Sequence, residues 1–145
     1  AVDKAFLELP ETETFNVFRV EKFNIVPWKE IGVFYGGDAY IVLNAVKVPN
    51  TDRIERDIYF WLGEESTQDE QGTAAIKTVE LDDRYQGEPT QHREVQGHES
   101  NEFLDLFDKY YAPSDNQQSS SKPRKSTKRQ TPNKSKGTSK PPLRR

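Results

Sequence analysis

The stretch DEQGTAAIKTVELDD, from Asp69 to Asp83, has the periodicity of a helix but carries two apolar stripes instead of one. At about 100° per residue, four residues fall within about 60° of one another and form the side expected to pack on a sheet: Ala74, Thr78, Leu81 and Tyr85. The nearly opposite side carries Gly72, Ile76, Val79 and Asp83. That side is expected to face water, yet it holds two β-branched aliphatic residues and a glycine, which weakens a helix by about 1 kcal/mol relative to alanine.

The spacing alone leaves two interpretations of the second stripe open. Isolated apolar residues are common on protein surfaces, and another element of the chain could cover these. In the second interpretation the helix lies in the groove of a partner. Ile76 and Val79 are then its anchors, and Gly72 allows close approach.

The helix is expected to extend beyond the quoted stretch, from about Gln68 to Tyr85. Ser66 and Asp69 have the spacing of a capping box at its start. Gly87 is placed to end it, because glycine readily adopts the left-handed conformation that follows many helices.

Two acidic residues near the end of this helix, Asp82 and Asp83, occupy an unfavourable position. The helix macrodipole is negative there and disfavours a carboxylate by about 0.3–1 kcal/mol. Solvation of both carboxylates, or the positive charge of Arg84, could offset this cost. A bound calcium ion could also do so, because the carboxylate is followed by the turn in LDDRYQGEP (Leu81–Pro89), whose carbonyl oxygens can converge on a cation.

Segments rich in β-branched and aromatic residues alternate with turn-like residues, which predicts a sheet. The expected strands are FNVFRV (Phe15–Val20), VFYG (Val33–Gly36), AYIVLNAVKV (Ala39–Val48), RDIYFWLG (Arg56–Gly63) and TQHREVQG (Thr90–Gly97). The last is strongly polar and is therefore expected near an edge. With a second, short helix at about Ser100–Tyr110, the sequence predicts an α/β fold, a mixed sheet with a helix on either face.

Composition divides the chain into a folded part, residues 1–111, and a tail, residues 112–145. The first part holds all eight Phe, six Tyr and two Trp, and has 11 basic against 23 acidic residues, a net charge of −12. The tail has 10 basic residues against one acidic residue, a net charge of +9, and its only large aliphatic residue is Leu143. Because the tail cannot bury enough apolar surface to offset its chain entropy, it is expected to be disordered.

Several classes of function have little support in the sequence. The chain has no cysteine, no apolar run of membrane-spanning length and no G-x-S-x-G, phosphate-loop or Cys-nucleophile motif, so we expect a soluble protein that is not an enzyme. His92 and His98 lie six residues apart without the ligand spacing of a zinc site. Asp38, after Gly36 and Gly37, is commonly only a turn residue, although a Gly-Asp pair can give a carbonyl and a carboxylate to one cation. The absence of Met and the start at Ala1 suggest a fragment or a processed form.

Several long motifs in a fixed order resemble the first domain of the gelsolin, villin and severin family of actin-binding proteins. They are FRVEKFNIVP (Phe18–Pro27), GGDAYIVL (Gly36–Leu43), FWLGEESTQDEQGTAAIKTVELDD (Phe60–Asp83), GEPTQHREVQGHES (Gly87–Ser100) and FLDLF (Phe103–Phe107). The resemblance covers roughly residues 6–110. It implies a gelsolin-like domain, with a central five- to six-stranded mixed sheet between one long and one short helix.

The resemblance also implies a function for the second stripe. In the family, the long helix of the first domain inserts its outward apolar residues between two actin subdomains at the filament barbed end. By matching position, the implied actin-binding residues are Ile76, Val79 and Asp83, with Gln68, Gly72 and Glu80 nearby. The expected activities are binding of actin monomers and capping of barbed ends, with weak severing at most.

Two calcium sites are implied in the same way. The internal site matches the carbonyl of Gly37 and the carboxylates of Asp38 and Glu70. The site at the actin interface matches Asp82 and the carbonyls of Gly87 and Pro89, and a carboxylate of actin completes it.

The sequence departs from the family pattern at three places. A Gly-rich segment that supplies a further carbonyl to the internal site is replaced by APSDNQQSSS, residues 112–121. Pro89 stands where the family often has a small residue, which stiffens the turn. The domains that normally follow are absent from this sequence, and since severing needs a second grip on the filament, we expect monomer binding and capping to exceed severing.

The basic tail suggests a function of a different class. Anionic phosphoinositide lipids, actin filaments or nucleic acids would all attract it electrostatically, and the alternative is an adaptor whose tail binds membranes or nucleic acid while the domain serves as a scaffold. Because no aromatic residues are interleaved with the basic ones, nucleic acid is not expected as a partner. We expect a monomeric protein of the cytoplasm and cytoskeleton, with actin as its main partner.

Overall fold

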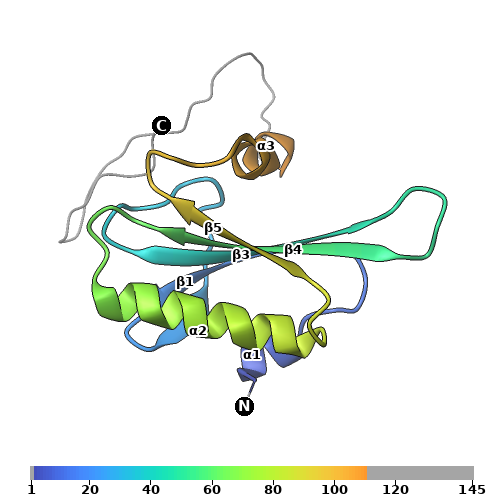
Figure 1. The fold of residues 1–145 in the computed structure, drawn as a ribbon, viewed down its shortest axis with the longest axis horizontal. Helices are drawn as coiled ribbons and strands as arrows, with labels where there is room; N and C mark the ends of the chain where they lie inside the picture. The colour runs from blue at the N-terminus through green and yellow to red at the C-terminus, as the bar shows by residue number, and fades with distance from the viewer. Residues whose placement is uncertain (1, 111–145) are drawn as a thin grey trace.

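A five-stranded mixed sheet lies at the centre of the structure, a computed structural model that describes residues 2–110 (Figure 1). The strands are β1 (Thr14–Glu21), β2 (Asn24–Pro27), β3 (Ala39–Lys47), β4 (Ile54–Leu62) and β5 (Thr90–Val95), in the order β2-β1-β3-β4-β5. The first four pair antiparallel and β5 pairs parallel to β4. The predicted mixed sheet and the edge position of the polar strand are confirmed.

The two longer helices cover opposite faces of the sheet, α2 (Gln68–Arg84) on one and α3 (Asn101–Tyr110) on the other (Figure 1). Central strand β3 is buried on both sides, since Ile41 and Leu43 join the core under α2 while Tyr40 and Val42 join the core under α3. A strand buried on both faces needs a continuous apolar run, and this is what the segment from Ala39 provides. The predicted architecture, one long and one short helix around the sheet, is therefore present.

The capping box of α2 lies one residue later than predicted. Thr67 is the N-cap: its hydroxyl accepts a hydrogen bond from the Glu70 N–H (3.0 Å), and the Glu70 carboxylate accepts one from the Thr67 N–H (2.8 Å). The Ser66 hydroxyl instead donates to the carbonyl of Gly63 at 2.6 Å and accepts from the Gln71 side chain at 3.1 Å.

The end of α2 is also set by a residue next to the predicted one. Gln86 has a positive φ of 62°, and Gly87 follows with a φ of 79°. Their N–H groups donate to the carbonyls of Asp83 and Asp82 at 2.9 Å, the two hydrogen bonds of a Schellman motif. Gly87 thus closes the motif, while Gln86 takes the left-handed position.

One predicted strand is wrong, and strand β2 and one helix were not among the predicted elements. The segment Val33–Gly36 forms only an isolated bridge at Tyr35, because Phe34 is buried in the aromatic core under α3 and the Tyr35 N–H donates to the Tyr40 hydroxyl instead of to a neighbouring strand. A short helix, α1 (Lys4–Leu7), begins after Asp3, whose carboxylate caps it.

No helix within residues 2–110 is long and apolar enough to cross a membrane. The predicted disordered tail, residues 112–145, lies outside the described residues, and the domain boundary at residue 111 stays a prediction.

Candidate functional site

The second apolar stripe of α2 is exposed. Ile76 and Val79 are 62% and 49% exposed, whereas the four residues expected to pack on the sheet are buried: Ala74, Thr78, Leu81 and Tyr85. Gln68, Gly72 and Asp83 are exposed as well. We call the five residues Gln68, Gly72, Ile76, Val79 and Asp83 the outer face of α2. Within residues 2–110 no element covers this face, so the interpretation that the chain itself buries it does not hold for the described part.

Gly72 has no structural reason to be glycine within this domain. A Cβ atom added there would meet no atom within 4 Å, and the residue does not have a positive φ. The missing side chain therefore lowers the surface of the outer face without relieving any contact inside the domain. Glycine in a helix interior costs about 1 kcal/mol of stability relative to alanine. A requirement imposed by a partner outside the domain would explain why the cost is accepted.

Glu80, the sixth residue assigned to actin binding, lies beside the outer face and is held by other groups. Its carboxylate accepts a hydrogen bond from the Asp3 N–H (3.0 Å) and contacts the Lys77 ammonium (3.3 Å), which also pairs with the Asp3 carboxylate (3.2 Å). Burial opposes the charge of Lys77, but its hydrogen bonds to Asp3 and Glu80 outweigh this and raise the pKa of Lys77. Glu80 thus ties α2 to the start of the chain.

Asp82 carries a polar atom that the folded domain leaves without a partner. Its Oδ2 accepts a hydrogen bond from the Gln91 side chain at 2.8 Å, while its Oδ1 is buried and has no hydrogen-bond partner. A buried carboxylate oxygen in this state costs roughly 1–3 kcal/mol or more unless a partner from outside the chain, such as water or an ion, binds it. Asp82 is therefore compatible with the predicted role of a cation ligand. Pro89, in the turn that follows the helix, is buried.

Two members of the internal ligand set, Gly37 and Asp38, lie where the loop before β3 meets the approach to α2, and the third, Glu70, lies in the first turn of α2. The Gly63 N–H donates to the Asp38 carbonyl (3.0 Å) and the Glu65 N–H donates to the Gly36 carbonyl (2.8 Å). A Cβ at Gly63 would come within 2.2 Å of the Gly36 carbonyl oxygen, so only glycine allows this approach. Gly37 is buried in this loop and Asp38 is partly buried at the start of β3.

Both carboxylates of the internal set already have protein partners. The Asp38 carboxylate lies 3.5 Å from the Tyr40 hydroxyl and 3.9 Å from the Arg19 guanidinium, while that of Glu70 belongs to the capping box. A cation bound there would share Glu70 with the helix cap and would meet the positive charge of Arg19.

Comparison with known proteins identifies the family. The family model described as the gelsolin repeat matches residues 26–104. The chain belongs to the gelsolin repeat family. The chain is 50% identical over 107 residues to cytoplasmic gelsolin of Homarus americanus, covering 72% of this chain and 14% of that protein. It is 43% identical over 110 residues to gelsolin-like protein 1 of Lumbricus terrestris, covering 74% of this chain and 30% of that protein.

A solved structure has a similar fold. The complex of Thorarchaeota 2DGel3 with rabbit actin matches with a TM-score of 0.54 and 33% identity over 65% of this chain and 43% of that chain. The chain spans less than a third of the length of the two relatives named above. The resemblance inferred from the sequence motifs is thereby confirmed for the family and the fold.

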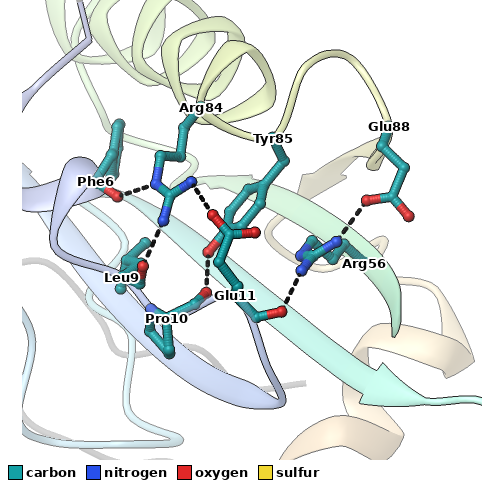
Figure 2. A network of polar contacts seen from close by, with 8 residues as sticks. All are labelled: Phe6, Leu9, Pro10, Glu11, Arg56, Arg84, Tyr85 and Glu88. Carbon is teal, nitrogen blue, oxygen red and sulfur yellow. Dashed lines mark hydrogen bonds and ion pairs between the residues drawn. The ribbon is translucent and has the colours of Figure 1, made fainter. Parts of the chain in front are cut away.

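The domain contains a polar network that the sequence did not predict, between the N-terminal segment before the matched repeat and the end of α2 (Figure 2). The Arg84 guanidinium donates to the carbonyls of Phe6 (3.0 Å) and Leu9 (2.6 Å) and to the Glu11 carboxylate (2.8 Å). The hydrogen bond from Arg84 lowers the pKa of Glu11. Arg84 thus bonds to the N-terminal segment. It does not supply a partner for the Oδ1 atom of Asp82.

Arg56 extends the network to the turn that follows α2. Its guanidinium donates to the Glu11 carbonyl (2.7 Å), pairs with the Glu88 carboxylate (2.6 Å), and stacks over the Tyr85 ring 4.3 Å from its centroid (Figure 2). Glu88 lies between Gly87 and Pro89, the two residues whose carbonyls were predicted as ligands. The network therefore reaches the turn that carries them.

Arg84→Ala is expected to destabilise the domain by about 2–3 kcal/mol, because two backbone carbonyls lose a charged donor and only the exposed Glu11 can turn to water. Arg84→Lys should recover part of the loss, since an ammonium cannot reach both carbonyls in the same geometry. Urea unfolding followed by circular dichroism measures this. Exposed Arg93 provides the matched control, and an equal effect of Arg93→Ala would show that the loss is one of net charge.

Proposed function

We propose that this gelsolin repeat binds actin by placing the outer face of α2 in an apolar cleft of actin, and that it thereby sequesters monomers and caps barbed ends. The observation that carries the proposal is the exposure of Ile76 and Val79 on one side of a helix whose other side is fully packed. A relative of similar fold has been solved in complex with rabbit actin, which supports actin as the partner. The activity needs no chemical step and belongs to the cytoplasm and cytoskeleton.

The size of the apolar contribution shows what else the interface requires. Full burial of a valine or isoleucine side chain stabilises by about 1.5–3 kcal/mol, so two side chains that are about half exposed contribute about 1.5–3 kcal/mol together. A micromolar complex needs about 8 kcal/mol. The two anchors therefore provide a minority of the binding free energy, and polar contacts at Gln68 and Asp83 and a bridging cation are proposed to supply more.

We further propose that calcium regulates the interaction through the two ligand sets named above. Asp82 with the carbonyls of Gly87 and Pro89 would hold one ion at the partner surface, with a carboxylate of actin closing the shell. Gly37, Asp38 and Glu70 would hold the other within the domain. When bound at the surface, the ion supplies positive charge between acidic groups of the two proteins. The buried, unpartnered Oδ1 of Asp82 supports the first set, and the protein partners of Asp38 and Glu70 suggest that the second is weaker.

Assembly of pyrene-labelled actin from barbed-end seeds tests the proposed function. In calcium, substoichiometric protein should stop elongation from the seeds, and chelator should restore most of it. The assay repeated at low and high salt distinguishes the alternative adaptor function, because binding driven by the basic tail falls steeply with salt while apolar insertion does not. Unaffected elongation at saturating protein and calcium would exclude capping.

Gly72→Ala separates the stability of the helix from binding to the partner. The variant should raise the free energy of unfolding by about 0.5–1 kcal/mol, because alanine favours the helix and its Cβ meets no neighbour. The same Cβ should weaken actin binding several-fold if the partner approaches the helix backbone closely. Fluorescence-detected binding to labelled actin, measured beside thermal unfolding, checks both. A variant that is stabilised and binds normally would remove Gly72 from the interface.

A further inference from the structure

A second group of ligand-type side chains lies on the face of the sheet opposite α2. Asp57 from β4, His92 from β5 and Glu102 from α3 place one oxygen or nitrogen each within 4.8 Å of one another. The His92 Nε2 is 2.7 Å from the Asp57 Oδ1 and 3.8 Å from the Glu102 Oε2. Since α2 and α3 cover opposite faces, this group is separated by the sheet from the outer face of α2 (Figure 1).

The group is held in place by Tyr59 of β4, which is buried. His92 lies beside Tyr59 in the parallel register of β4 and β5, and the two rings stack with centroids 4.5 Å apart. The Tyr59 hydroxyl donates to the Glu102 carboxylate at 2.5 Å. One side chain thus orients both the imidazole and a carboxylate.

The donor set has the chemistry of a zinc-type cation. In a tetrahedral zinc site with bonds of about 2.0–2.1 Å, donor atoms lie about 3.3 Å apart. Separations from 2.7 Å to at most 4.8 Å need only small side-chain shifts to reach this value. An imidazole nitrogen with two carboxylates suits zinc or cobalt, whereas calcium prefers oxygen alone.

Charge balance points the same way. Two carboxylates face one imidazole, so even a protonated His92 would neutralise only one of them, while a divalent cation neutralises both. Glu102 is 54% exposed, which leaves solvent access for a fourth ligand. A hydrogen bond from Tyr59 to a ligating carboxylate is the kind of outer contact that metal sites use to hold their ligands.

We propose that Asp57, His92 and Glu102 form a binding site for a transition-metal dication of the zinc class, with Tyr59 as a positioning residue. The site is separate from both proposed calcium sites. A metal bound there joins β4, β5 and α3, so it fastens the short helix to the sheet without contacting the outer face of α2.

Titration of the untagged full chain with Zn²⁺, in calcium that fills oxygen-only sites, tests the proposal. Calorimetry should give one Zn²⁺ per chain, and Co²⁺ should give the visible absorption of a four-coordinate ion. His92→Gln should lower the affinity for Zn²⁺ and for Co²⁺ by at least tenfold each. His98, the only other histidine of the chain, provides the matched control, and His98→Gln should bind like the parent. Equal binding by parent and His92→Gln, or equal loss in both variants, would overturn the site.

Two further variants keep the test decisive if His92→Gln unfolds the domain. Glu102→Gln changes an exposed side chain and should lower Zn²⁺ affinity at least tenfold with unchanged thermal unfolding of the metal-free chain. Tyr59→Phe keeps the ring that stacks on His92 and removes only the hydroxyl, so it should lower affinity roughly tenfold. Parent-like affinity in the folded Glu102→Gln variant would also overturn the site.

Discussion

Ile76→Asp and Val79→Asp are each expected to abolish measurable actin binding while shifting the free energy of unfolding by no more than about 0.5 kcal/mol. The two side chains are largely exposed in the domain and make their apolar gain only when a partner buries them. An aspartate there loses that gain and also places a carboxylate in an apolar cleft, which costs several kcal/mol. Together these terms correspond to a loss of affinity of at least about 100-fold.

The domain offers two matched controls for this result. Leu7 and Phe23 are also large, apolar and exposed, at 58% and 65%, but they lie on α1 and on the turn between β1 and β2. Leu7→Asp and Phe23→Asp should bind actin normally. Co-sedimentation and thermal unfolding on all four variants provide the comparison. Loss of binding in the controls would point to a general charge effect, and parallel loss of stability and binding at Ile76 would mean that it belongs to a core.

Asp82→Ala should leave calcium binding by the free domain almost unchanged and speed dissociation of the actin complex in calcium by about 10–100-fold. The proposed surface shell is closed only by the partner, so the free domain gains little from Asp82. Removing its buried, unpartnered Oδ1 should also not destabilise the domain, since only the Gln91 hydrogen bond is lost. Stopped-flow dissociation from labelled actin and calorimetry on the free domain measure the two effects.

The internal calcium set needs a control that respects the helix cap. Glu70→Ala would remove a ligand and also the capping box, so Glu70→Gln is the better variant, because glutamine can keep the cap while losing the carboxylate charge. Asp38→Asn is its companion. Both should weaken calcium binding to the free domain. By linkage, calcium must also raise the affinity for actin by the same factor by which actin raises the affinity for calcium. A calcium ion lost from the free domain in Asp82→Ala would refute the division into two sites.

Periodicity made much of the fold and of the outer face of α2 predictable. The two stripes of α2 follow from its spacing alone, and the polar run from Thr90 identified an edge strand. The capping box was predicted one residue too early because STQDE (Ser66–Glu70) contains two pairs at the same spacing, and in the fold the Ser66 hydroxyl contacts Gly63 while Thr67 and Glu70 form the box. Local sequence does not contain that contact.

The parts that were missed depend on residues far apart in the chain. Arg84 was one of several alternatives for offsetting the charge of Asp82 and Asp83, and its hydrogen bonds reach Phe6, Leu9 and Glu11 instead. His92 was dismissed as a metal ligand because the nearest histidine is six residues away, while its neighbours in space come from another strand and another helix. Spacing within one segment cannot reveal a group that three elements assemble.

The bond between Arg84 and the Phe6 carbonyl spans 78 residues, which bears on how the chain folds during synthesis. Phe6 is fully buried in the finished domain and belongs to the core under α2. At a translation rate of about 5–20 residues per second, it waits about 4–16 s for Arg84 to be made. Contacts of such long range also slow folding in general. During that interval the Phe6 ring has no complete α2 to pack against. An exposed apolar ring of this kind is what chaperones that hold nascent chains bind.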